Sequence, residues 1–132
     1  MPSWPIEYTA PFVGPTAVSL NVETVFATVT GVGTDQANRK VRLFGQVNFT
    51  TGAGTTSLTL RWRRDSIAGA VVNAAQVDTL ASAAGSSEDH SILATDSPGE
   101  ISGATYVCTV QQTAAAANGQ WNSSVASATV HN

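Results

Sequence analysis

The stretch Lys40-Val-Arg-Leu-Phe-Gly-Gln-Val-Asn-Phe49 alternates polar and apolar residues, and so does Ser57-Leu-Thr-Leu-Arg-Trp-Arg-Arg64. Successive side chains of a β-strand point to opposite faces, so each stretch predicts a strand with one apolar and one polar face. The short segment Thr51-Gly-Ala-Gly54 between them is typical of a turn. The sequence therefore predicts a β-hairpin of strands 41–49 and 57–63, with Gly45 opposite Trp62 in the ladder.

All six basic residues of the chain lie between Arg39 and Arg64, an interval without any acidic residue. In the predicted hairpin, Arg63 would lie beside Phe44 and Arg42 beside Asp65, on one outward surface. Arginine and aromatic residues together are typical of interface centres, so this surface is a candidate for partner binding. Its candidate residues are Arg42, Phe44, Arg61 and Arg63.

Three interpretations of the basic surface stay open. Its arginines could pair with acids of the same chain on a solvated sheet face, or contact an acidic protein neighbour such as another copy, or bind nucleic acid. A single aromatic residue and a few cations on a chain of net charge −3 make a poor nucleic-acid groove. We therefore expect no nucleic-acid partner.

The chain from residue 17 onward also consists of short alternating segments separated by turn residues. A change of phase near Glu23-Thr24 predicts a bulge or turn, and Asn118-Gly119 predicts a tight turn. Helical periodicity is absent, so the 132 residues predict one all-β domain, an antiparallel two-sheet sandwich of seven or eight strands. The further expected strand segments are 17–22 with 25–29 after the change of phase, 70–72, 76–80, 91–94, 105–113 and 121–130.

The first sixteen residues contain four prolines among large apolar side chains. Proline is excluded from helix interiors and from central strands, so we expect an extended arm, 1–16, ahead of a single sandwich domain, 17–132. Exposed apolar surface costs about 25 cal/mol per Å², so the arm either folds back over the domain or docks on a partner subunit. Its candidate partner-binding residues are Trp4, Ile6, Tyr8 and Phe12.

Few residues suggest chemistry. The single cysteine, Cys108, alternates with apolar residues and predicts a buried, inert thiol. Asp89-His90-Ser91 holds the residue types of a catalytic triad, but neighbours on a strand point to opposite faces. The acids Glu88, Asp89, Asp96 and Glu100 lack the ligand spacing of a calcium loop. No apolar run approaches a membrane span. We therefore expect no enzyme activity, cofactor, metal site or membrane partner.

The type of sandwich is indicated by two details. The run Gly103 to Cys108, with Tyr106, and a strand tryptophan, Trp62, resemble immunoglobulin-like domains. The earlier cysteine of that family is missing, because Gly45 or Val47 stands about where it would be. A trimeric, tumour-necrosis-factor-like jelly roll produces the same late strand. The prediction is therefore a jelly roll in preference to an immunoglobulin-like fold.

The chain resembles small β-sandwich virion proteins of tailed bacteriophages in three stretches. They are the segment 40–49, the segment 57–64 followed by Ile67-Ala-Gly69, and Thr105-Tyr-Val-Cys-Thr-Val-Gln-Gln-Thr113 with Asn118-Gly119. The resemblance spans roughly residues 18–130. It implies a structural protein on the exterior of the virion, assembled in the host cytoplasm. Capsid decoration as a homotrimer is the implied role, with capsid or other virion proteins as partners and the arm as the attachment.

An alternative function is a carbohydrate- or receptor-binding module of a phage tail fibre. Tryptophan rings are suited to stacking on sugars, and the chain has three of them. In this alternative the sugar platform would be Trp4, Trp62 or Trp121.

Overall fold

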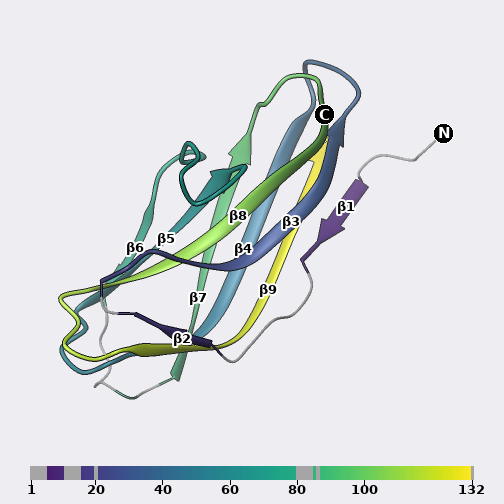
Figure 1. Cartoon of the computed structure of the whole chain (residues 1–132). Helices are drawn as coiled ribbons and strands as arrows, with labels where there is room; N and C mark the ends of the chain where they lie inside the picture. Colours follow the sequence, from purple (N-terminus) through teal and green to yellow (C-terminus); the bar gives the residue numbers. More distant parts are fainter. Residues whose placement is uncertain (1–5, 11–15, 20, 80–84, 86, 132) are drawn as a thin grey trace.

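The computed structural model describes residues 6–10, 16–19, 21–79, 85 and 87–131 (Figure 1). In these ranges the chain forms nine β-strands and no helix. The strands are β1 (Ile6–Thr9), β2 (Thr16–Val18), β3 (Thr24–Thr34), β4 (Lys40–Thr50), β5 (Ser57–Arg64), β6 (Gln76–Thr79), β7 (Ser87–Asp96), β8 (Ile101–Thr113) and β9 (Gly119–His131).

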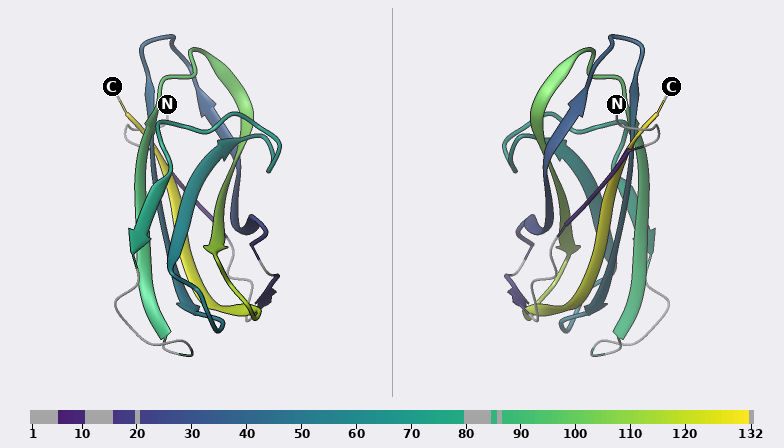
Figure 2. Two further views of the ribbon diagram at one scale, coloured as in Figure 1. Left: turned by 90° about the vertical axis from the view of Figure 1, so that its left-hand side faces the viewer. Right: turned by 90° about the vertical axis from the view of Figure 1, so that its right-hand side faces the viewer.

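The strands form two antiparallel sheets that pack face to face (Figure 2). Sheet A has the order β1-β9-β4-β7, and β2 also pairs with β9. Sheet B has the order β3-β8-β5-β6. The predicted all-β sandwich is therefore confirmed.

The strand pairs are nested along the chain: β5 pairs with β6, β4 with β7, β3 with β8, and β1 with β9. This order of pairs is the one that a single long antiparallel hairpin would have. In this protein the hairpin is rolled up, so that β4 also pairs with β9 and β5 also pairs with β8. Rolling a long hairpin into two sheets produces the jelly roll. The preference for a jelly roll over an immunoglobulin-like sandwich is confirmed by this order.

The predicted hairpin of 41–49 with 57–63 is wrong. β4 belongs to sheet A and β5 to sheet B, because the connection 51–56 crosses from one sheet to the other. The Gly52 N–H donates to the Gln112 side chain on β8 at 3.1 Å, and the Thr56 N–H to the Thr113 carbonyl at 3.1 Å, so this connection is fastened to sheet B. Alternation specifies which face of a strand is apolar, but it does not specify the neighbouring strand.

The ladder partners of the basic strands differ accordingly. Arg42 lies between Thr95 and Thr129, and Phe44 lies between Leu93 and Ser127. The expected pairings of Arg63 with Phe44 and of Arg42 with Asp65 do not occur. The Asn118-Gly119 dipeptide likewise joins strands of different sheets, because β8 lies in sheet B and β9 in sheet A.

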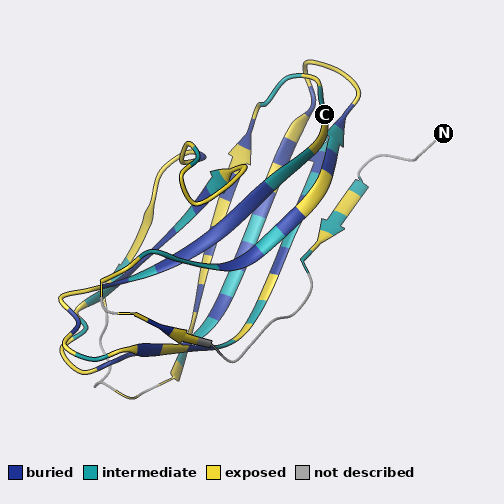
Figure 3. Cartoon of the chain, in the orientation of Figure 1, coloured by how far each residue is buried: buried dark blue, intermediate teal, exposed yellow. Residues whose placement is uncertain are grey.

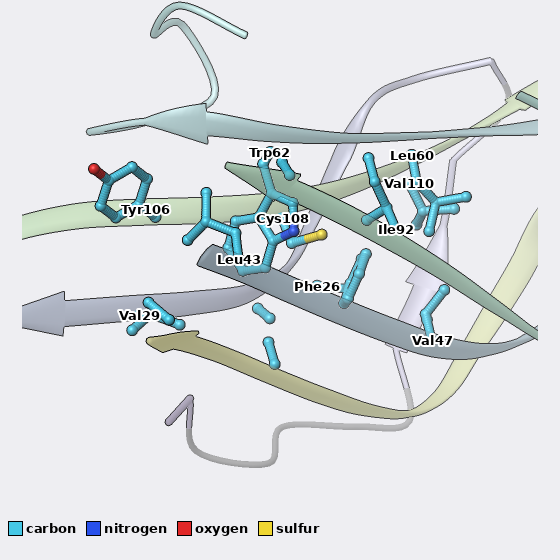
Figure 4. Packing of buried hydrophobic residues seen from close by; sticks show 14 of the residues in the cluster. Phe26, Val29, Leu43, Val47, Leu60, Trp62, Ile92, Tyr106, Cys108 and Val110 are labelled. Carbon is cyan, nitrogen blue, oxygen red and sulfur yellow. The ribbon is translucent and has the colours of Figure 1, made fainter. Parts of the chain in front are cut away.

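The core lies between the inner faces of the two sheets, and buried residues alternate with more exposed ones most regularly along β4 and β7 (Figure 3). At its centre Gly45 of β4 faces Trp62 of β5 and Cys108 of β8. Figure 4 shows Trp62 and Cys108 next to each other in this core. The predicted ladder pairing of Gly45 with Trp62 is wrong, because Gly45 pairs with Ile92 and Ala126, and Gly45 and Trp62 meet across the core instead. A Cβ on Gly45 would lie 2.7 Å from the Cys108 Sγ and 3.3 Å from the Trp62 ring. The absence of a side chain there lets the two sheets approach.

The described part of the predicted arm runs along the outer edge of sheet A. Ile6 pairs with Val130, and the Ala10 N–H donates to the Ala126 carbonyl at 3.0 Å. β2 continues along the same strand, with Val18 opposite Gly119.

The bulge or turn predicted near Glu23-Thr24 lies between two backbone irregularities of the structure. Asn21 has a left-handed backbone, with φ of 52°, and the β3–β8 register shifts between Val25 and Ala27. The extra residue, Phe26, is buried and meets the Trp121 ring edge-on, with centroids 6.3 Å apart. Val25 and Ala27, which the sequence predicts on one face, therefore lie on opposite faces.

A buried carboxylate joins the two sheets at one end of the sandwich. Asp96 of β7 receives hydrogen bonds from the Arg64 Nε at 2.7 Å and the Tyr106 hydroxyl at 2.7 Å, both from sheet B. Burial opposes ionisation of Asp96, but the two hydrogen bonds and the Arg64 charge outweigh it and hold the pKa of this carboxyl below its ordinary value. Asp96 is therefore ionised in the folded protein at neutral pH.

Replacing Gly45 tests the close approach of the sheets. We expect Gly45→Ala to lower the free energy of unfolding by about 1–3 kcal/mol, because its Cβ overlaps the Cys108 Sγ. Urea denaturation measures the change. The matched control is Gly33→Ala, whose Cβ meets only the Ile101 carbonyl at 3.7 Å. In a Cys108→Ala background the cost of Gly45→Ala should fall; an unchanged cost would contradict the contact.

Replacing Asp96 tests the link between the sheets. The pKa of Asp96 is lower in the folded protein than in the unfolded chain, where a carboxyl of this kind has a pKa of about 3.9. The stability that ionised Asp96 contributes is therefore fully present above about pH 3.9, and it is lost as the pH falls through the folded pKa. We expect Asp96→Asn to cost about 2 kcal/mol at pH 7, with the difference from the parent shrinking below about pH 4. Chemical denaturation over this pH range is the measurement, and exposed Glu100→Gln is the control. A pH-independent difference would contradict this account.

Candidate interaction surfaces

The arm residues named from the sequence have different surroundings. Trp4 and Phe12 lie outside the described residues. Tyr8 is half-buried and packs against the core cluster, while Ile6 is half-buried beside a surface hollow. Part of the apolar surface of β1 is therefore covered by the chain itself, and a role of these residues in binding a partner stays a prediction.

The candidate basic residues lie on opposite sides of the sandwich. Arg42 and Phe44 are on the outer face of sheet A, whereas Arg61 and Arg63 are on the outer face of sheet B. The expectation of one continuous basic surface is therefore wrong, since it depended on the hairpin. Binding of a partner at either group separately stays a prediction.

Arg61 and Arg63 converge on one carboxylate, Glu23, from the segment that precedes β3. The Arg63 Nε donates to Glu23 Oε2 at 2.6 Å and its Nη2 to Oε1 at 2.9 Å, while the Arg61 Nη1 donates to Oε1 at 3.1 Å. The Thr109 hydroxyl adds a fourth hydrogen bond at 2.8 Å. One acid in this part of the molecule thus binds two guanidinium groups.

The electrostatics of this cluster follow from its geometry. Burial opposes ionisation of Glu23, yet the hydrogen bonds from Arg63 and Thr109 and the charges of both arginines outweigh it, so the pKa of the carboxyl lies below its ordinary value. The hydrogen bond to Glu23 raises the pKa of Arg63. Of the three open interpretations, pairing within the chain is the one that describes Arg61 and Arg63.

The segment Asp89-His90-Ser91 forms no catalytic triad. His90 is buried toward the core side of β7, and its Nδ1 lies 2.9 Å from the Asp78 Oδ2 on β6, while Asp89 and Ser91 are exposed. Its Nε2 lies 3.4 Å from the Glu88 Oε2. His90 therefore links the edge strands of the two sheets.

Other candidate chemistry is also accounted for. Within the described ranges no group of three or more His, Cys, Asp or Glu side chains could hold a metal ion. Burial raises the pKa of the Cys108 thiol, as expected of an inert core cysteine. No helix in the described part of the chain is long and apolar enough to cross a membrane.

Two of the three tryptophans proposed as a sugar platform lie in the core. Trp62 has no exposed surface and Trp121 is 5% exposed. Neither ring can stack on a sugar, and Trp4 lies outside the described residues. The side chains named for a tail-fibre module therefore form no platform among the residues that the structure places.

One surface hollow, of about 370 Å³, lies beside β1, β3 and β8. Its walls are mainly small or apolar, and its ionisable residue is Asp35, which binds the Arg39 guanidinium at 3.0 Å. A second hollow of about 220 Å³ lies over Arg64 and Tyr106, which already bind Asp96. Asp35 in the first hollow and Arg64 and Tyr106 in the second are therefore engaged by the chain itself.

The outer face of sheet A carries apolar residues that the sequence reasoning did not single out. Leu93 is 70% exposed and Val125 is 62% exposed. Each precedes or follows an inward apolar residue, Ile92 and Ala126, and adjacent apolar residues on a strand cannot both face the core. Two adjacent apolar residues on a strand could therefore have identified the outward apolar residue from the sequence. The exposed Leu93 and Val125 make this face a candidate interaction surface.

Comparison with known proteins shows the fold of the chain. No protein-family model matches it, and no curated protein matches it. Among solved structures it is similar to a chain of infectious bursal disease virus, Gx strain, with a TM-score of 0.56 and 12% identity over 97% of this chain. A chain of the Gt strain of the same virus gives a TM-score of 0.51 and 12% identity over 96% of this chain.

The protein spans about a third of the length of these viral chains, 32% in each case. The match is to a eukaryotic virus, so it bears on viral proteins of this fold and not on tailed bacteriophages in particular. At 12% identity the likeness concerns architecture. The chain is therefore an all-β sandwich of an architecture that is also present in virus particles.

Proposed function

We propose that the chain is a structural, non-enzymatic protein of a virus particle, and that it acts as a decoration protein on the exterior of a phage shell. The observation that carries the proposal is the match of 97% of the chain to a viral chain of the same fold. Fold likeness alone is an analogy, so the chemistry of the surface must agree with it.

The surface agrees in two respects. Only 11% of the residues are charged, and the Arg61, Arg63 and Arg64 cations are bound by acids of the same chain. Sheet A in addition exposes apolar side chains on its outer face. A surface of low charge with an apolar centre is suited to binding other proteins.

The proposed mechanism is the addition of interface area. Each copy contributes a small binding free energy, which is multiplied over the many equivalent sites of a symmetric shell. In this mechanism the arm and the outer sheet faces are the binding surfaces. The homotrimer implied by the resemblance to phage proteins stays a prediction.

The proposal is tested with particles of the virus that encodes the chain, produced with and without its gene. We expect particles lacking the protein to assemble but to lose their contents at lower temperature, because the added interfaces are missing. Purified protein should restore resistance and saturate at a fixed ratio to the main shell protein. Particles that never contain the protein, or that gain no resistance from it, would contradict decoration.

Removing residues 1–5 tests the arm. This deletion removes Trp4 but leaves Ile6–Thr9 available to pair with β9. We expect an unchanged unfolding midpoint and at least about tenfold weaker binding to protein-free particles, measured by co-sedimentation. The control replaces residues 1–5 by a Gly/Ser segment of equal length and should bind as weakly as the deletion. Unchanged binding by both variants would remove the arm from the mechanism.

A further inference from the structure

The centre of the outer face of sheet A is an apolar patch that spans three strands. Phe44 of β4 is directly opposite Leu93 of β7, and Val125 of β9 is opposite Gln46, the next outward residue of β4. Leu93 and Val125 are 70% and 62% exposed. Exposed apolar residues are ordinary when scattered, but a contiguous group marks a binding site.

Across β9, β4 and β7 the face is divided into rows, and Arg42 and Asp89 lie at its opposite ends. Glu7 of the short strand β1 lies beside Thr129 in the Arg42 row. Arg42 lies one row to one side of Phe44, and Asp89 lies two rows to the other side. In order, the rows are Thr129–Arg42–Thr95, Ser127–Phe44–Leu93, Val125–Gln46–Ser91 and Ser123–Asn48–Asp89.

We propose that this face is a self-complementary interface at which two copies of the chain stack face to face. The two-fold axis lies in the interface, runs across the strands, and passes between the Phe44 row and the Gln46 row. This symmetry exchanges the first row with the fourth and the second with the third. Closed two-fold dimers of this kind are the commonest oligomers of soluble proteins.

The exchange of rows brings large side chains over small ones. Leu93 of one copy lies over Ser91 of the second copy, and Val125 lies over Ser127. The two-fold axis repeats each contact, so the apolar patches of both copies are covered. Two packed sheets interdigitate in this manner at a separation of about 10 Å.

The charges select the antiparallel arrangement. Arg42 of each copy comes over the row of Asn48 and Asp89 of the other, where the Asn48 amide donates to the Asp89 carboxylate at 2.9 Å. A stack with parallel strands would instead place Arg42 over Arg42. Complementary charges at the rim determine orientation more than affinity, so they decide between these two arrangements.

The face is large enough for a dimer. The three strands β9, β4 and β7, spaced about 4.8 Å apart, with the eleven residues of β4 rising about 3.3 Å each, cover roughly 520 Å² in projection. A standard interface buries about 800 Å² per partner. The contact is therefore of the size expected for reversible association.

The free edge of the same sheet is less suited to pairing. The Asn73 side chain accepts the Thr95 N–H of β7 at 2.6 Å, which occupies one end of this edge, and the side-chain contact of His90 with Asp78 holds β7 beside β6. An occupied edge resists addition of another strand. The face is accordingly the surface at which a second copy binds.

Charge exchange tests this inference in solution, independently of the proposed function. The parent should show a monomer–dimer equilibrium in sedimentation equilibrium. Arg42→Glu and Asp89→Arg should each weaken the dimer about tenfold, because each brings like charges together. An equimolar mixture of the two variants, and the double variant, should associate as the parent does, because opposite charges face each other again.

Apolar truncation provides the second measurement. Leu93→Ser should weaken the dimer about tenfold, whereas Val77→Ser, at an exposed valine of sheet B, should leave it unchanged. Circular dichroism confirms folding of each variant. A parent that stays monomeric at millimolar concentration, an association insensitive to Leu93→Ser, or a mixture no stronger than its components would overturn the inference.

Discussion

The close approach of the two sheets at Gly45 is the constraint on which the rest of the structure depends. The Trp62 ring and the Cys108 Sγ occupy the space that a side chain on Gly45 would need. Interiors are packed as densely as organic crystals, so this single position sets how far apart the central strands β4, β5 and β8 can lie. The inward side chains of the other strands then fill the space that remains between the two sheets.

The polar connections follow from the same arrangement. Asp96 reaches across the sheets to Arg64 and Tyr106 at one end, and His90 reaches from β7 to Asp78 on β6 along one edge. Glu23 binds Arg61 and Arg63 on the outer face of sheet B. The arginines of β5 are thus engaged within the chain, and the outer face of sheet A is left with its apolar centre and its two charged ends.

The sequence predicted a large part of the fold and less of the candidate site. Alternation located β4 and β5 and assigned Leu43, Leu60 and Trp62 to the core, which the structure confirms. It also led to a hairpin that does not exist, and with it to a continuous basic surface. Leu93 and Val125 were not singled out, because an outward apolar residue becomes conspicuous only when its ladder neighbours are known.

What the amino-acid sequence determined by itself was the strand content and the two faces of each strand, because the period of two is a local property of the backbone. Tertiary structure alone decided which strands are neighbours, and therefore that Arg42 lies on the opposite side of the sandwich from Arg61. That outcome depends on contacts between residues far apart in the chain, such as Gly52 with Gln112 in the connection that leads from sheet A to sheet B. A local pattern carries no information on such contacts, because either sheet would satisfy the same alternation.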